Sequence, residues 1–117
     1  MDRKTYKKLF KKRYKVFGKV LKSIRKKQVH ISQVALAERL GMDQSYVSKT
    51  ETGERRLDIM ELIAYSDAMG LCLTDFIFRL EWKLYEEGLT PTKRQEQIKK
   101  WLEIYKIYCT PSPPSKK

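Results

Sequence analysis

Apolar side chains recur at three- and four-residue steps along most of this chain, and polar or charged residues fill the intervals. Because an α-helix brings every third and fourth residue to one face, this spacing predicts a series of amphipathic helices. The longest apolar stripes run over residues 5–27 and 92–108, and no stretch alternates in the manner of a strand. The predicted fold class is therefore all-α.

Residues 33–49 predict two short helices that cross at the small side chain of Ala37 and are joined by a tight turn. Gly41 ends the first helix, because glycine adopts a left-handed backbone at little cost. Asp43 then offers a side-chain acceptor to the free N–H groups that start the second helix. The outer face of the second helix consists of Gln44, Ser45, Ser48 and Lys49. A compact pair of helices with such a polar face is typical of proteins that present a helix to the DNA major groove.

Local signals place three further helices after this pair. Asp58 and Glu61 form a capping box at the start of the first of them. Thr74 is expected to cap the next helix, and Gly88 and Pro91 separate that helix from the last one. The apolar residues expected on the inner faces of the first two are Ile59, Leu62, Ile63, Met69, Phe76, Ile77, Leu80, Leu84 and Tyr85.

Positive charge is concentrated at the start of the chain. The 117 residues include 26 Lys and Arg against 14 Asp and Glu, which gives a formal net charge of +12. Residues 1–27 contain 13 of the basic residues and one acidic residue, so they carry the whole excess. A basic block of this size predicts a polyanionic partner, with nucleic acid favoured over an anionic membrane surface. Gly18 either is tolerated inside this helix, at about 1 kcal/mol relative to alanine, or marks the end of a basic arm over residues 1–16.

The composition argues against an enzyme, a metal site and a membrane protein. Cys72 and Cys109 are far apart, and the single histidine, His30, has no cluster of possible ligands around it. No glycine-rich phosphate loop or nucleophile–base pair is present in the sequence. No apolar run approaches the roughly 18 residues of a membrane helix or the core of a signal peptide. We therefore expect no catalytic residue, no metal, no cofactor and no membrane partner, and a cytoplasmic, nucleoid-associated protein of bacterial or phage type.

From Phe17 to Ile77 the sequence resembles the lambda-repressor/Cro-like (XRE-type) helix–turn–helix DNA-binding family. The match runs through SQVALAERLGMDQSYVSKTETGERRL and the helix after Asp58, and ends at AMGLCLTDFI. The resemblance implies a five-helix lambda-repressor-like domain, over residues 17–87, whose third helix, over residues 43–52, enters the major groove. By position, the residues expected to contact bases are Gln44, Ser45 and Lys49. Those expected to contact the DNA backbone are Gln33, Tyr46, Ser48, Thr52, Arg55, Arg56, Lys26 and Lys27.

Three positions near the third helix carry separate expectations. Glu51 is expected to be a structural partner of a loop or core group rather than a DNA contact. Thr50 stands where the family usually has a bulky apolar residue, so the helix is expected to be held a little less firmly. For Arg55 and Arg56 the alternative to phosphate contact is a solvated loop.

Two segments lie outside the shared domain: the basic N-terminal arm or helical extension, and a C-terminal helix within residues 88–108. That helix offers an apolar stripe, of a kind favoured at interfaces, made of Trp101, Leu102, Tyr105 and Tyr108. The stripe either packs on its own domain, for which the face from Tyr6 to Tyr14 is one candidate, or forms a homodimer, or binds another protein. The Pro/Ser-rich tail over residues 109–117 is expected to be disordered.

The predicted function is a sequence-specific transcriptional regulator, a repressor, that binds double-stranded DNA as a dimer on an inverted repeat. Two other interpretations remain open. One is an antitoxin-type interaction module whose DNA-binding domain serves autoregulation. The other is a membrane-surface protein that uses the basic N-terminal helix, although this leaves the polar face from Gln44 to Lys49 without a use.

Overall fold

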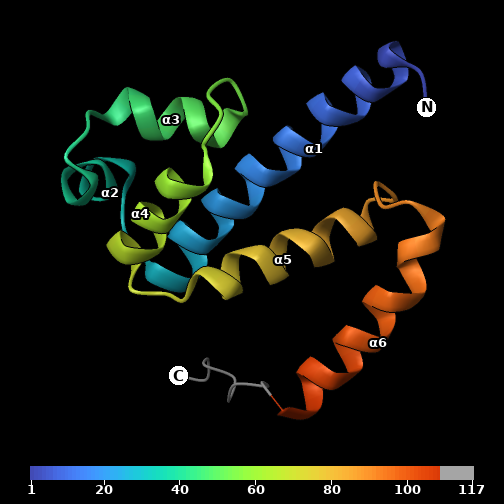
Figure 1. The fold of residues 1–117 in the computed structure, drawn as a ribbon. Coiled ribbons are helices and arrows are strands. Elements are labelled where there is room, and N and C mark those ends of the chain that lie inside the picture. The colour runs from blue at the N-terminus through green and yellow to red at the C-terminus, as the bar shows by residue number, and fades with distance from the viewer. Residues whose placement is uncertain (109–117) are drawn as a thin grey trace.

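The computed structural model describes residues 1–108, with the side chains of residues 1–104. The predicted disordered tail, Cys109 and the side chains of Tyr105 and Tyr108 therefore lie outside the described residues. The described part is helical and contains no strand, which confirms the all-α class (Figure 1). In chain order the elements are α1 (Arg3–Ser23), the π-helical turn η1 (Ile24–Val29), α2 (Gln33–Leu40), α3 (Gln44–Thr52), α4 (Ile59–Met69), α5 (Leu73–Glu86) and α6 (Thr92–Tyr108).

Most helix ends follow from local side-chain chemistry. The Asp43 carboxylate accepts a hydrogen bond from the backbone N–H of Tyr46 at the start of α3. Asp58 and Glu61 make both bonds of the predicted capping box at α4. The expectation that Thr74 caps α5 is wrong, because the helix begins two residues earlier and Cys72 occupies the cap position without a side-chain bond.

The first helix differs from its prediction at both ends. It starts at Arg3, because the carboxylate of Asp2 accepts from the backbone N–H of Thr5. After Ser23 it widens into η1, which ends at His30 in the left-handed conformation (φ 60°). The helical segment therefore extends two residues beyond residue 27, where the predicted apolar stripe ends.

The core draws on all of the first five helices. Its buried apolar residues are Val16, Val20, Leu21, Ile24, Leu36, Ala37, Val47, Leu62, Tyr65, Met69 and Phe76. Two predicted core positions are wrong, since Ile59 is 54% exposed and Ile77 is 41% exposed. Tyr65 is fully buried instead and fills the space between α3 and α4, with its ring centroid 6.3 Å from that of Tyr46.

At Gly18, α1 closely approaches the backbone of the C-terminal part of α3. A Cβ atom on Gly18 would lie 2.3 Å from the carbonyl oxygen of Glu51 and 3.0 Å from that of Thr50. No side chain larger than hydrogen fits this contact without movement of the backbone. Gly18 therefore does not break α1, which continues through it, and its role is to admit α3.

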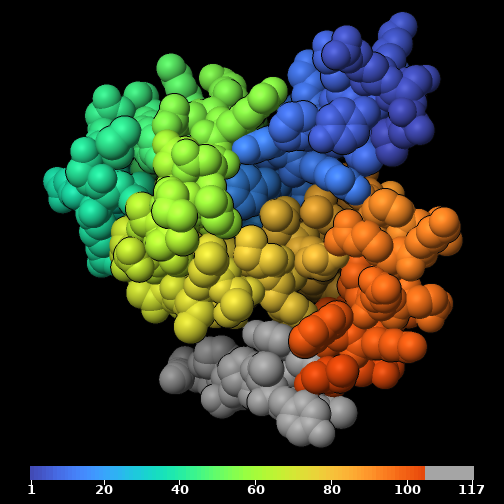
Figure 2. Space-filling model, viewed as in Figure 1, coloured from blue at the N-terminus to red at the C-terminus, as the bar shows by residue number. Residues whose placement is uncertain are grey.

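The two long helices at the ends of the chain both pack on α5. The guanidinium of Arg13 on α1 donates two hydrogen bonds, of 3.2 and 3.0 Å, to the carbonyl oxygen of Leu89, just beyond α5. On the other side α6 folds back along α5, where Ile98 is buried and Arg94 pairs with Glu81 (Figure 1). The N-terminal half of α1 projects beyond the end of α3, as Figure 2 shows in blue.

Candidate nucleic-acid interface

The helix pair α2–α3 is held by small and branched apolar residues and leaves one face of α3 outside. Ala37 and Val47 are buried where the two helices meet. The side chains of Gln44, Ser45 and Lys49 are exposed, whereas Ser48 is half-buried. The structure therefore leaves the three residues expected to read bases on the accessible side of α3.

A buried ion pair lies beneath this face. Glu51 of α3 receives two hydrogen bonds from the guanidinium of Arg25 in η1, at 2.6 Å from Nε and 3.0 Å from Nη2. The two side chains are 2% and 7% exposed respectively. Arg25 also donates from Nη1 to the carbonyl oxygen of Ile31, 2.9 Å away. The expectation that Glu51 is a structural partner is confirmed, and Arg25 is a residue that sequence analysis counted only as part of the basic block.

From the ion pair a chain of hydrogen bonds leads outward to the exposed face. Gln33, at the start of α2, donates from Nε2 to Oε1 of Glu51 over 2.9 Å. Its Oε1 accepts from Nε2 of Gln44 over 3.2 Å. A carboxylate can only accept, so the amide nitrogen of Gln33 must face Glu51 and its oxygen must face Gln44. The buried charge thereby fixes the orientation of the exposed Gln44 amide.

The fixed amide has a defined set of groups left for a ligand. One N–H of Gln44 is used by Gln33, which leaves the other N–H and the carbonyl oxygen. A donor beside an acceptor is the pattern that pairs with the N7 and N6 groups of adenine in the major groove. The Gln44 amide is thus held in one orientation, with one donor and one acceptor left for a ligand.

Ser45 and Asp43 form a smaller unit at the start of α3. The Ser45 hydroxyl donates to the Asp43 carboxylate over 2.8 Å. This hydroxyl and the backbone N–H of Tyr46 hold the pKa of Asp43 below its ordinary value. The helix start therefore stays capped by an ionised carboxylate at neutral pH, with the Ser45 oxygen still exposed to accept from a base or phosphate.

The two arginines after α3 are ordered by the protein's own residues. The Arg55 guanidinium lies 4.4 Å from the ring centroid of Tyr46 and pairs with Glu61 over 2.6 Å. The Arg56 guanidinium lies 4.7 Å from the ring centroid of Phe10 on α1. Arg56 is nevertheless exposed, and the side chain of Arg55 is 40% exposed, so both reach the solvent. A phosphate contact by these arginines would be added to cation–π contacts that already exist.

The other residues expected to contact the DNA backbone lie at three places. Thr52 is exposed at the end of α3, where its hydroxyl donates to the carbonyl oxygen of Lys49. Tyr46 is half-buried, and its hydroxyl donates to Glu61 over 3.4 Å. Lys26 and Lys27 are exposed on η1, next to Arg25 in the chain.

Thr50 is fully buried at the crossing with α1. Its hydroxyl donates to the carbonyl oxygen of Tyr46 over 2.7 Å, so the polar group has a partner inside α3. Gly18 of α1 and Thr50 of α3 are thus both small where the two helices meet. Thr50, which stands where the family usually has a bulky apolar residue, therefore lies at a close crossing of α1 and α3.

An apolar groove of about 770 Å³ runs between α5 and α6. Ile77, Phe78, Trp82, Trp101 and Leu102 are among the side chains that line it. Trp101 is 66% exposed, although Ile98 one turn earlier is buried. Ile98 of α6 is therefore packed on α5, whereas Trp101 lies largely at the surface.

Within residues 1–108, no cluster of three or more His, Cys, Asp or Glu residues could hold a metal ion. None of the helices in that part of the chain combines the length and apolar character needed to cross a membrane.

Sequence comparisons agree with the geometry of α2 and α3. A sequence model of the helix–turn–helix family matches residues 21–76. A control protein, C.MunI, from a Mycoplasma species is 31% identical over 65 residues. The aligned region covers 56% of this chain and 88% of that protein.

Proposed function

Because the chain belongs to the XRE-type helix–turn–helix family and is a DNA-binding transcriptional regulator, we propose that it recognises its site by placing α3 in the major groove. In this proposal Gln44, Ser45 and Lys49 contact base edges. Gln44 pairs with adenine, and Lys49 reaches the O6 and N7 acceptors of guanine.

The observation that carries the proposal is the hydrogen-bond chain from Glu51 through Gln33 to Gln44. A buried ion pair has little net value for stability compared with apolar residues of similar size. Here it fixes the direction of an exposed amide, which is useful only if that amide must meet a ligand in one orientation. Base reading supplies such a ligand.

Selection from random duplex DNA at near-physiological salt tests this proposal. The protein should enrich a sequence motif that contains adenine and guanine at the positions facing Gln44 and Lys49. Lys49→Ala should then lower the preference at one base step by about 1–3 kcal/mol, which is roughly 5- to 150-fold. Equal losses on the selected and on random duplexes would show that Lys49 does not read a base.

Phosphate contacts are proposed for the residues that flank α3. They would position the protein without selecting a sequence. Affinity should therefore fall with salt, with a log–log slope of about −0.9 for each phosphate neutralised. The residues proposed for this role are Gln33, Tyr46, Ser48, Thr52, Arg55, Arg56, Lys26 and Lys27.

We further propose that the protein binds as a homodimer through the apolar groove between α5 and α6. The exposed Trp101 and the neighbouring Leu102 and Trp82 would be its anchors, since tryptophan is favoured at the centre of interfaces. A two-fold dimer reads an inverted repeat, so the selected motif should be palindromic. Sedimentation equilibrium should show a dimer that Trp101→Arg dissociates and that the matched surface change Lys100→Ala leaves intact.

A monomer that co-purifies at equal stoichiometry with a different protein would instead support the antitoxin-type module, with the same groove as its binding surface. For regulation we propose repression, because a protein bound over a promoter blocks access to it. A reporter gene in bacterial cytoplasm, with the selected site inside its promoter, should lose expression when this protein is present. An unchanged or raised expression would refute repression.

A further inference from the structure

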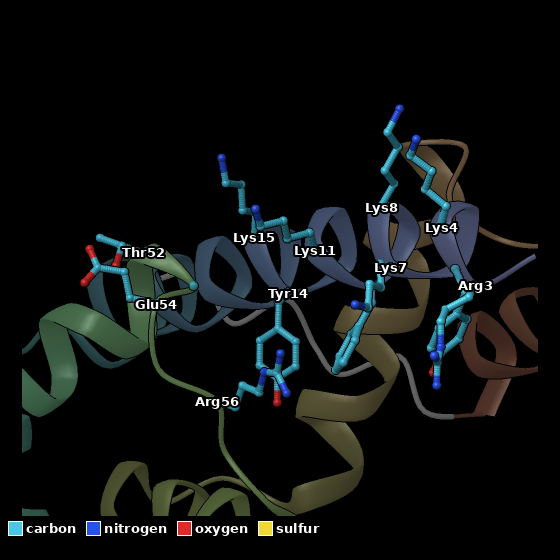
Figure 3. A pocket seen from close by; sticks show the side chains of 13 residues that line it. Arg3, Lys4, Lys7, Lys8, Lys11, Tyr14, Lys15, Thr52, Glu54 and Arg56 are labelled. Carbon is cyan, nitrogen blue, oxygen red and sulfur yellow. The ribbon is translucent and has the colours of Figure 1, made fainter.

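The most strongly charged surface of the protein lies on the N-terminal half of α1, outside the helix–turn–helix. Its centre is a lysine ridge, which we define as Lys4, Lys8, Lys11 and Lys15. These residues are spaced by four, three and four positions, so they share one face of the helix. Figure 3 shows that Lys4, Lys8 and Lys15 extend from the same side of α1, while Tyr14 points to the other side.

The lysine ridge begins at the C-terminal end of α3 and leads away from it. Lys15 abuts the turn after α3, since a Cβ atom on Gly53 would lie 3.4 Å from its Cα atom. An open hollow of about 1060 Å³ lies between α1 and the segment from Thr52 to Arg56 (Figure 3). Glu54 is the one acidic residue among those that line it. A ligand that passes the end of α3 would therefore meet a positively charged track.

Stability does not account for this arrangement of lysines. Like charges four residues apart destabilise a helix by about 0.2–0.5 kcal/mol per pair. The first turn of α1 has no acidic residue, so cations lie at the end of the helix dipole that favours anions. Among the residues that the structure describes, none of the ridge lysines forms an ion pair. The positive surface must therefore serve something outside the folded chain.

The ridge is rigid, because the helix that carries it is held at several points. Arg13 binds the carbonyl oxygen of Leu89, and Tyr14 donates to the carbonyl oxygen of Leu57 over 3.3 Å. Arg56 packs over the ring of Phe10. These contacts hold the helix that carries the lysines against the rest of the domain, which distinguishes the ridge from an unstructured basic arm.

We propose that the lysine ridge binds the phosphate backbone of the duplex next to the base pairs read by α3, on the side of its C-terminal end. The proposal rests on the proposed function, because α3 must lie in the major groove for the ridge to reach flanking DNA. Eleven residues of helix span about 17 Å. Phosphates of one strand advance about 3.4 Å each along the duplex axis, so the ridge covers roughly five phosphates.

The test compares two variants that lose the same charge. The ridge variant carries Lys4→Gln, Lys8→Gln, Lys11→Gln and Lys15→Gln. The control variant carries Arg79→Gln, Lys93→Gln, Lys99→Gln and Lys100→Gln, all at exposed positions on α5 and α6. Each is titrated with a short duplex that holds only the selected half-site and with a longer duplex that adds flanking base pairs of arbitrary sequence.

The wild-type protein and the control variant should both bind the longer duplex more tightly than the short one. The ridge variant should lose at least about tenfold in affinity for the longer duplex and bind the short one nearly unchanged. Its log–log salt slope on the longer duplex should become shallower by about 3–4, since each phosphate contributes about 0.9. Its thermal midpoint should equal or exceed that of the wild type, because the repulsion within α1 is relieved.

Equal losses in the ridge and control variants would overturn the proposal, as would a ridge-variant loss of the same size on both duplexes. Failure of the proposed function has a different result. If no sequence is enriched but added duplex length still strengthens binding only when the ridge is intact, base reading by α3 is refuted and the phosphate contact of the ridge stands.

Discussion

Replacing Gly18 with alanine should destabilise this protein, even though alanine is the better helix former by about 1 kcal/mol. The new Cβ atom would lie 2.3 Å from the Glu51 carbonyl oxygen and 2.8 Å from the carbonyl carbon. Both are backbone atoms of α3, so the methyl group fits only if α1 and α3 move apart. Overpacking of a core costs about 1–3 kcal/mol. Because the clash is with backbone atoms, its cost lies at the upper end of this range, about 3 kcal/mol. Subtracting the gain in helix propensity of about 1 kcal/mol leaves a net loss of about 2 kcal/mol.

Thermal unfolding followed by far-ultraviolet circular dichroism measures this loss. For a chain of this size about 2 kcal/mol lowers the midpoint by roughly 8 °C. Ser23→Ala is the matched control, because Ser23 is exposed in the same helix and its replacement should change stability by less than about 0.5 kcal/mol. A Gly18→Ala midpoint equal to or above that of the wild type would refute the reasoning, since helix propensity would then outweigh the contact with α3.

Three further changes test the core and the site. The buried Tyr65 hydroxyl has no hydrogen-bond partner among the described residues, so Tyr65→Phe should keep or raise the free energy of unfolding in urea, by up to about 1 kcal/mol. Burial raises the pKa of the Tyr65 hydroxyl from 10.0 to about 12. Because the unfolded chain loses this proton at a lower pH than the folded protein does, the free energy of unfolding should fall between pH 10 and about 12. This fall should be less steep in the Tyr65→Phe variant. Glu51→Ala leaves Arg25 buried without its carboxylate and should cost about 3–5 kcal/mol in the same urea titration. Gln33→Ala should lower the preference for adenine in a competition assay by more than it lowers non-specific affinity, because it removes the acceptor that orients Gln44 as well as one proposed phosphate contact.

The parts of the fold that sequence analysis predicted depend on neighbouring residues. Gly41 ends α2 in the left-handed conformation, with φ of 70°. Asp43 and Asp58 cap the helices that follow them. Such signals act within one turn of helix, so they can be found without knowledge of how the helices pack.

The parts that sequence analysis missed depend on contacts between distant residues. Arg25 and Glu51 are 26 residues apart, and no local pattern pairs one arginine of the basic block with a particular glutamate. Gly18 looks like a tolerated helix residue until α3 is placed against it. Periodicity finds the inner face of α4 but not its centre, which is why Ile59 was expected inside and Tyr65 was not expected at all.

The folded core and the family match cover different lengths of the chain, as the burial of Val16 and Val20 shows. The sequence model of the family matches residues 21–76, yet both valines precede that stretch and lie inside the core. Beyond its other limit, Leu80 and Leu84 of α5 pack against the same core. A fragment cut to the boundaries of that match would therefore keep the surface proposed to read DNA and lose part of the interior that supports it. A transfer of the helix–turn–helix to another protein must therefore include all of α1 and α5.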